Sequence, residues 1–253
     1  MLESRWPERL WIVRHGESAG NVARIAAMEA GQAVIDIAGR DVDVPLSALG
    51  ERQSAVLGRW FASQAMRPDV VFTSPYLRAR RTAALMQENG GIAAEPVEFH
   101  VDERLREKEF GVLDRLTRLG IEERYPEQVE FRRSLGKFYH RPPGGESWCD
   151  VILRLRSTLD TVLLQCSGKR VLIVGHQVVV LCMRYLLEGM DEEAILAIDA
   201  AGDVANCAVT GYAFDPAAGR EGGLVLQRYN FVAPLEREET PVTAEPDVQA
   251  GAR

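Results

Sequence analysis

A cation and an imidazole lie side by side near the start of the chain, where Arg14 and His15 follow the apolar run Leu10-Trp11-Ile12-Val13. Four consecutive apolar residues predict a strand that is buried on both faces, as in a parallel sheet. Such a strand delivers both side chains to the edge of the core, and Gly16 lets the backbone turn closely around whatever they hold. We therefore expect His15 to be a nucleophile aimed at an anionic group. Taken alone, a surface arginine beside a capping histidine is the better interpretation.

Two later apolar strands end in residues of the same kind. Val70-Val71-Phe72 leads to Ser74 and Arg78, and Val171-Leu172-Ile173-Val174 leads to His176. The carboxyl ends of parallel strands meet at one edge of a sheet, which is where open α/β sheets bind ligands. We expect the three strand ends to converge there, and this convergence favours the chemical interpretation of the first one.

These side chains suit phosphoryl transfer. A phosphoryl group in transfer spreads negative charge over its oxygens, so catalysis depends on positioning and on electrostatic neutralisation. The planar guanidinium of Arg14 or Arg78 can grip two oxygens and keeps its charge. A neutral imidazole at His15 can attack phosphorus to form a phosphohistidine, and the leaving oxygen then needs a proton from an acid. His176 can donate a further hydrogen bond to the phosphoryl oxygens.

Helices and strands alternate along the chain. This alternation predicts a three-layer α/β/α sandwich with a mostly parallel sheet. We expect a short helix and then a lid or rim loop over residues 20–43, and a helix capped by Ser47 that ends before Pro68. Further helices are predicted over residues 77–88, 114–138, 146–165 and from 177 to about 188, and further strands over 97–99, 204–214 and 224–229.

Composition excludes several classes of protein. The 253 residues are 46% hydrophobic, which fits a globular protein with a sizeable core, and the formal charge of −7 argues against a general nucleic-acid binder. The four cysteines show no C-x-x-C pair, so neither a metal site nor a disulfide framework is expected. No apolar run is long enough to span a bilayer, and the N-terminus lacks a signal-peptide core. We expect a cytoplasmic protein that needs no cofactor or metal.

The domain organisation follows from the same composition. We predict one domain over residues 1–235 and a disordered tail over 236–253, because the tail is rich in Glu, Pro, Thr and Ala and poor in apolar residues. The expected partner is a small phosphorylated substrate, with no nucleic acid and no membrane. The oligomeric state stays open, and a homo-oligomer is one alternative.

Five motifs in order resemble the histidine phosphatase superfamily, which includes the cofactor-dependent phosphoglycerate mutases. They are Arg14-His15-Gly16-Glu17-Ser18 with Asn21, Pro45-Leu46-Ser47-x-x-Gly50, Ser74-Pro75-x-x-Arg78-Ala79-x-x-Thr82-Ala83, Gly144-Gly145-Glu146-Ser147 and Gly175-His176. The resemblance spans about residues 10–230, and it implies the phosphoglycerate mutase-like fold, in which the mostly parallel sheet has an antiparallel edge strand. It implies that His15 is phosphorylated, that Arg14, Arg78 and His176 form the phosphate pocket, and that Asn21 touches the substrate phosphate.

The resemblance also points to a proton donor. The carboxylate four residues before Gly111 falls on Glu107, which we take as the acid. Glu109 is the alternative, since it would face the same way if this segment is extended. Glu146 and Ser147 are expected to cap the next helix, and His100 and His140 are expected to lie on the surface.

A narrower resemblance links the middle of the chain to the bisphosphatase half of 6-phosphofructo-2-kinase/fructose-2,6-bisphosphatase. It rests on Tyr125-Pro126-Glu127, Arg133, Lys137, Tyr139-x-Arg141, Gly145-Glu146-Ser147 and His176-Gln177. It implies that Arg133 and Lys137 grip a second phosphate, from one face of a helix at i, i+4 spacing, and that Trp148 and Gln177 line the same site. Leu181 replaces a family arginine, for which Arg184 is a candidate substitute.

These features predict a metal-independent phosphatase for a small phosphorylated metabolite, with a sugar bisphosphate as one candidate. A phosphoglycerate mutase is the first alternative, although Gln177-Val178 follows His176 where those mutases usually carry Gly-Asn-Ser. A catalytically idle scaffold of the same fold is the second alternative. No G-x-x-x-x-G-K-[ST] motif occurs, so a kinase half is not expected.

Overall fold

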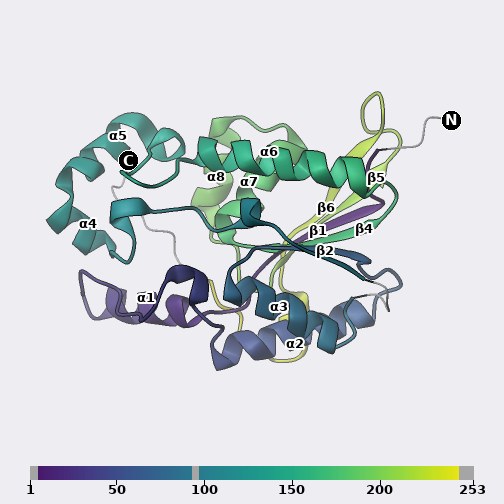
Figure 1. The fold of residues 1–253 in the computed structure, drawn as a ribbon, viewed down its shortest axis with the longest axis horizontal. Helices are drawn as coiled ribbons and strands as arrows, with labels where there is room; N and C mark the ends of the chain where they lie inside the picture. The colour runs from purple at the N-terminus through teal and green to yellow at the C-terminus, as the bar shows by residue number, and fades with distance from the viewer. Residues whose placement is uncertain (1–4, 93–96, 245–253) are drawn as a thin grey trace.

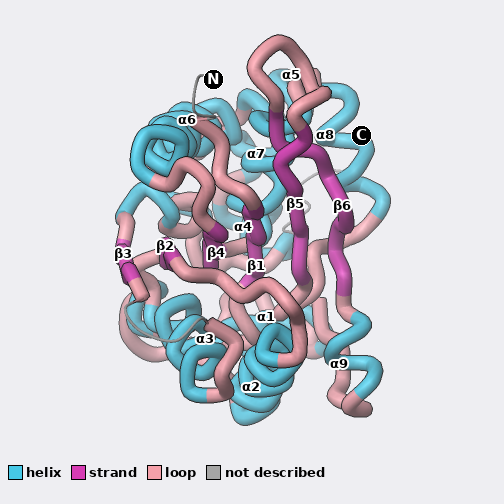
Figure 2. The backbone as a smooth tube through the Cα atoms, turned by 90° about the vertical axis from the view of Figure 1, so that its right-hand side faces the viewer, coloured by secondary structure: helices cyan, strands magenta, loops and turns pink. Residues whose placement is uncertain are grey.

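The computed structural model describes residues 5–92 and 97–244, and a six-stranded sheet runs through the middle of them (Figure 1). The sheet has the order β3-β2-β4-β1-β5-β6 (Figure 2). Its first four strands are parallel, whereas β5 is antiparallel to both of its neighbours. The mostly parallel sheet is thus confirmed, with its antiparallel pairing toward the β6 edge. The strands are β1 (Arg9–Arg14), β2 (Val70–Thr73), β3 (Glu98–Val101), β4 (Arg170–Gly175), β5 (Val209–Asp215) and β6 (Gly223–Phe231).

Helices cover both faces of this sheet, which confirms the three-layer sandwich. One face carries α2 (Ala48–Ala62), α3 (Leu77–Glu88) and the short α9 (Ala233–Arg237), and the other carries α6 (Trp148–Gln165), α7 (Gln177–Glu188) and α8 (Glu192–Ala201). Beyond the carboxyl ends of the parallel strands, at the left of Figure 1, lie α1 (Ala19–Glu29), α4 (Arg118–Arg124) and α5 (Pro126–Tyr139).

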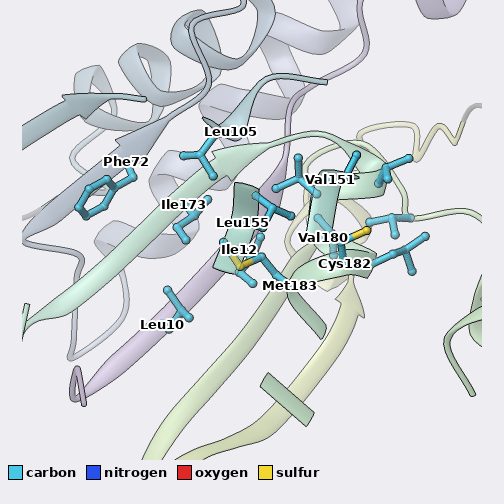
Figure 3. Close-up of a cluster of buried hydrophobic side chains, with 14 of the residues drawn as sticks. Leu10, Ile12, Phe72, Leu105, Val151, Leu155, Ile173, Val180, Cys182 and Met183 are labelled. Atoms are coloured by element: carbon cyan, nitrogen blue, oxygen red, sulfur yellow. The ribbon is translucent and has the colours of Figure 1, made fainter. Parts of the chain in front are cut away.

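The central strands are apolar along their length because alternate side chains enter two different cores. In β1 and β4, Leu10, Ile12 and Ile173 face the α6–α7 layer, where they pack with residues such as Leu155 and Met183 (Figure 3). Their sequence neighbours face the α2–α3 layer instead and include Val13, Leu172 and Val174. A strand covered on both sides cannot alternate between apolar and polar residues, which explains the continuous apolar runs.

The polar ends of these strands are neighbours in space. β2, β4 and β1 are adjacent in the sheet, and the register pairs Arg14 with Gly175 and Thr73 with Val174. Backbone hydrogen bonds continue past the strands, from His15 N to Gly175 O at 2.9 Å and from Ser74 N to Val174 O at 3.0 Å. The predicted convergence at one sheet edge is therefore confirmed.

Two sequence-based helix assignments need correction. The helical pattern over residues 114–138 is two helices, because Pro126 begins a new one and Tyr125 between them is not helical. Gly136 then interrupts α5 with φ 77° and ψ 161°. The second correction concerns α8, which the sequence analysis missed; Asp191 caps it by accepting a hydrogen bond from Ala194 N at 2.9 Å.

The tail expected to be disordered from residue 236 is packed as far as Thr243, so that expectation is wrong for this part. Gln53 Nε2 donates to the carbonyl of Pro241 at 2.9 Å, and Thr243 Oγ1 donates to Asn206 Oδ1 at 3.0 Å. These polar side chains find partners in the domain, a type of contact that an apolar-poor composition does not reveal. The remainder of the predicted tail, residues 245–253, lies outside the described residues.

Candidate active site

One ring nitrogen of His15 bonds to the backbone of its own loop, and the other accepts a hydrogen bond from an arginine. Its Nδ1 lies 2.7 Å from the carbonyl of Gly16, and since a carbonyl only accepts, Nδ1 carries the proton. Nε2 is then the nitrogen with the lone pair, and Arg78 Nε donates to it at 3.2 Å. Burial, followed by the charges of Arg78 and Arg14, lowers the pKa of His15 well below its ordinary value. The imidazole is therefore neutral, as a nucleophile must be.

The loop that carries His15 requires a glycine after it. A Cβ on Gly16 would lie 2.5 Å from the carbonyl oxygen of Gly50 and 2.8 Å from Ser54 Oγ. Gly16 N also donates to Thr82 Oγ1 at 3.1 Å, so α2 and α3 both fix this turn. The close approach of this backbone is to α2, and it fixes His15 at the end of β1.

His176 lies against His15, with ring centroids 5.1 Å apart, and is fully buried. Its Nε2 lies 2.8 Å from Ser74 Oγ, which already accepts a hydrogen bond from Tyr76 N at 3.3 Å. A Ser74 hydroxyl that donates to Nε2 leaves the ring proton of His176 on Nδ1. Nδ1 has no hydrogen-bond partner among the described residues and lies 3.6 Å from Glu107 Oε2. The ring can therefore offer a donor to an anion.

Arg14 and Arg78 are both buried beside the histidines. Arg14 Nη1 donates to Gln177 Oε1 at 3.0 Å and to the carbonyl of Val204. Arg78 reaches the site from the first turn of α3, and its terminal nitrogens contact Asp41. Burial, then the charge of Arg78, lowers the pKa of His176 well below its ordinary value. The four predicted residues thus form one cluster, in which two buried arginines lie beside two neutral imidazoles.

Of the two carboxylates considered as acids, Glu107 lies at the site and Glu109 does not line the cavity. Burial raises the pKa of Glu107 to about 7, despite a backbone hydrogen bond from Lys108 and the charge of Arg78. Glu109 is 48% exposed and accepts a hydrogen bond from Tyr76 at 3.3 Å. Residues 107–110 form no regular strand, and the two carboxylates have different surroundings.

A buried ion pair holds the backbone of Glu107 in place. Arg154, on α6, donates to the carbonyl of Glu107 at 3.2 Å and to Glu146 Oε1 at 2.9 Å. Glu146 also accepts from Arg106 Nη2 at 2.7 Å and from the backbone N–H of Glu109 at 3.1 Å. Glu146 therefore holds the segment that carries Glu107, whereas Ser147 caps α6 as predicted.

A cavity of about 110 Å³ opens over Arg14, His15, Arg78 and Glu107, whereas the fully buried His176 does not line it. Its predicted members are Arg14, His15, Asn21, Arg78, Glu107 and Gln177. Asn21 Oδ1 accepts from Ser18 N at 2.9 Å in the capping box of α1. Gln177 Nε2 donates to Asp203 Oδ1 at 2.7 Å. Both side chains are thus oriented by protein partners at the rim of the cavity.

Several residues that line the cavity were missed by the sequence analysis. They come from α1, from the loop that follows it and from the segment before α4: Arg24, Ile35, Ile37, Asp41, Phe110, Asp114 and Arg115. Arg115 has φ 58° and Nη1 donates to the carbonyl of Ile37 at 3.0 Å, so it ties the loop to the rim. No periodicity marks residues 30–43, and nothing in the sequence indicates which of them face inward.

Arg133 and Lys137 do not line the cavity, so the structure does not bring them to the other predicted site residues. Arg133 is 56% exposed and pairs with Glu130 at 2.9 Å, whereas Lys137 pairs with Asp199 at 2.5 Å. The i, i+4 argument assumed an unbroken helix, and the non-helical Gly136 between them removes their common face.

Other expected members of a second-phosphate site also lie elsewhere. Trp148 is buried in the core, and Arg184 pairs with Glu188 at 2.8 Å and stacks on Tyr229. His140 is buried rather than on the surface: its Nε2 lies 3.2 Å from Gln128 Oε1, and burial lowers its pKa to about 4. The partly exposed His100 stacks on Phe72.

In the described part of the chain, no three His, Cys, Asp or Glu side chains gather in an arrangement suited to a metal ion. Within residues 5–92 and 97–244, every helix is too short or too polar to cross a membrane.

Two neutral histidines, two buried arginines and a carboxyl group of raised pKa around a small cavity define a site suited to phosphoryl transfer. The sequence profile of the histidine phosphatase superfamily (branch 1) matches residues 10–225. The chain belongs to this family.

Similar proteins of known sequence carry different reactions in their names. A 2,3-bisphosphoglycerate-dependent phosphoglycerate mutase from Methylorubrum populi is 34% identical over 199 residues, which cover 77% of this chain and 86% of the mutase. A 6-phosphofructo-2-kinase/fructose-2,6-bisphosphatase from Gallus gallus is 29% identical over 188 residues, or 74% of this chain and 34% of that protein. The solved structure of Bacillus stearothermophilus YhfR shares the fold, with a TM-score of 0.70 at 23% identity over 91% of this chain and all of YhfR.

Proposed function

We propose that this protein is a metal-independent phosphatase that hydrolyses a small phosphorylated metabolite through a phosphohistidine on His15. The observation that carries the proposal is the pairing of a neutral His15, whose Nε2 faces Arg78, with a protonatable Glu107 at the same cavity. The nucleophile must lack a proton on Nε2 and the acid must carry one, and near neutral pH this site can hold both groups in those states. The small cavity favours a small substrate, since pockets for drug-sized ligands measure roughly 300–1,000 Å³.

In the first half-reaction, Nε2 of His15 attacks phosphorus while the N–H groups of Arg14, Arg78 and His176 neutralise the phosphoryl oxygens. The P–O bond to the leaving group breaks, and Glu107 gives its proton to the departing oxygen. In the second half-reaction, the Glu107 carboxylate takes a proton from water, whose oxygen attacks phosphorus. The P–N bond breaks, which releases inorganic phosphate and restores the neutral imidazole.

A phosphoglycerate mutase reaction is a second candidate, favoured by the name of the 34% identical Methylorubrum protein. The same phosphohistidine would then return its group to the substrate rather than to water. The Gln177-Val178 pair after His176 differs from the Gly-Asn-Ser run usual in those mutases, and this supports the phosphatase. A sugar bisphosphate is still one of the candidate substrates, but Arg133 and Lys137 have no role in binding its second phosphate in this proposal.

The test is a panel of small phosphate monoesters and sugar bisphosphates that includes 3-phosphoglycerate, assayed with and without EDTA. Phosphate release and isomerised product are both measured. We expect phosphate release that EDTA does not change and that His15→Ala reduces by about 10⁴-fold or more. Intact-mass measurement during turnover should show one added phosphoryl group in the wild type and none in His15→Ala.

Three other outcomes contradict the proposal. Isomerised product without free phosphate would identify a mutase. Loss of activity in EDTA that added metal restores would reject the metal-independent mechanism. No turnover of any substrate, with no phosphorylated intermediate, would favour the idle scaffold. His100→Ala is a matched control, since this histidine is partly exposed, lies outside the cavity and should leave activity unchanged.

A further inference from the structure

The phosphate-facing side of Arg78 is occupied by a carboxylate from its own chain. Asp41 Oδ1 accepts from Nη1 at 3.0 Å and Oδ2 accepts from Nη2 at 3.2 Å, while the Asp41 carbonyl accepts from Nη1 at 2.8 Å. This is the two-pronged contact by which a guanidinium also binds a phosphoryl group. The carboxylate thus stands where two phosphoryl oxygens would bind.

The same contact fixes Arg78 across the nucleophile. While the terminal nitrogens hold Asp41, Nε donates to Nε2 of His15 at 3.2 Å. That hydrogen bond engages the lone pair that must attack phosphorus. A phosphoryl group that approaches His15 therefore meets an occupied nucleophile and an occupied arginine, and both contacts must open for the reaction to begin.

The two partners differ in how easily they can move. The Arg78 side chain is 6% exposed, whereas the Asp41 side chain is 44% exposed and can be hydrated again without leaving the rim. Asp41 begins a short 3-10 turn, Asp41–Asp43, in the loop between α1 and α2. On electrostatic and steric grounds the aspartate, rather than the arginine, is the group that an incoming anion displaces.

We propose that Asp41 is a positioning residue of the phosphoryl site: it holds Arg78 across His15 and is exchanged for phosphoryl oxygens when substrate binds. The inference rests on the proposed function in one respect, that this cavity accepts a phosphoryl group. It holds for a phosphatase and for a mutase alike. It makes the free enzyme bind phosphate less tightly than its cluster of buried cations would allow.

The test measures the dissociation constant of inorganic phosphate by calorimetry at constant pH and ionic strength. In Asp41→Asn, which keeps the shape and removes the charge, we expect phosphate to bind about fivefold more tightly, the amount by which a partly exposed ion pair competes. KM should fall by a similar factor while kcat does not rise. Asp41→Ala repeats the test in a second variant, and thermal unfolding confirms that each one folds.

Two matched controls separate exchange at Arg78 from a general effect of charge. Asp43→Asn removes a carboxylate from the same turn, one that pairs with Arg40 at 2.7 Å, and should leave phosphate binding unchanged. Asp114→Asn removes a carboxylate that lines the cavity and lies 3.7 Å from Arg115, and should tighten binding less than Asp41→Asn does. Equal tightening in Asp41→Asn and Asp114→Asn would overturn the proposal, as would an unchanged dissociation constant in both Asp41 variants.

A failure of the proposed function can be distinguished from a failure of the exchange at Asp41. If wild-type protein binds no phosphate and Arg78→Ala behaves identically, the cavity is not a phosphoryl site and the exchange falls with it. If wild-type protein binds phosphate in an Arg78-dependent way and the Asp41 variants match it, only the exchange is wrong.

Discussion

The cations at the strand ends and the cations on α5 are held in opposite ways. Arg14 and Arg78 are buried, and contacts from several elements converge on them. Arg133 is exposed and pairs with Glu130 within its own helix, and Lys137 pairs with Asp199 of α8. Sheet register and burial place a side chain firmly at a site, whereas position on a helix face is lost at a single non-helical residue such as Gly136.

The largest effect expected from this comparison belongs to Arg78. Arg78→Ala should reduce kcat/KM by about 10³-fold, since it removes a charged donor from a water-poor site where oxyanion charge develops. Steady-state kinetics on the best substrate of the panel measure it. Arg78→Lys should recover only a small part, because an ammonium lacks the planar fork. Full activity in the lysine variant would mean that charge alone suffices.

Glu107 should show a smaller effect that depends on the substrate and on pH. Glu107→Gln should slow esters of poor leaving groups by about 10²-fold and spare phosphohistidine formation from good ones. With a pKa raised to about 7, Glu107 is protonated below that pH and ionised above it, so kcat should fall as pH rises through about 7. The Glu107→Gln variant should not show this fall in kcat.

A pH–rate profile for wild type and Glu107→Gln, with one aryl and one alkyl phosphate, checks both statements. Equal losses for both leaving groups would argue against an acid role. Glu109→Gln is the control for the neighbouring carboxylate that does not line the cavity, and it should keep the wild-type profile.

The smallest effect on activity is expected on α5. Arg133→Ala should change kcat/KM by about twofold or less, because its ion pair is exposed and lies away from the cavity. Lys137→Ala should likewise spare activity but lower the free energy of unfolding by about 1–3 kcal/mol, since its bond to Asp199 is partly buried. Urea unfolding measures the free energy of unfolding, and steady-state kinetics measure kcat/KM. A large rise in KM in either variant would support the second-phosphate site after all.

The side chains at the strand ends could be placed from the sequence. Apolar runs ending in polar residues were enough to place Arg14, His15, Ser74 and His176 at one edge, because parallel register leaves little choice. The contact between Asp41 and Arg78 could not be predicted, since it joins residues 37 apart through a loop with no periodicity. The role of Glu146 was also missed: a residue beside a helix cap gives no sign that it pairs with Arg106 and Arg154.

The position of β1 in the sheet has a consequence for how the protein is made. This early strand pairs on one side with β4, where Arg9 meets Arg170, and on the other with β5, where Arg9 meets Ala213. The backbone carbonyl of His15 accepts a hydrogen bond from Asn206. During synthesis, His15 therefore leaves the ribosome long before Asn206, which lies 191 residues further along the chain. The surroundings of His15 are complete only after the segments that form β4 and β5 have also been made.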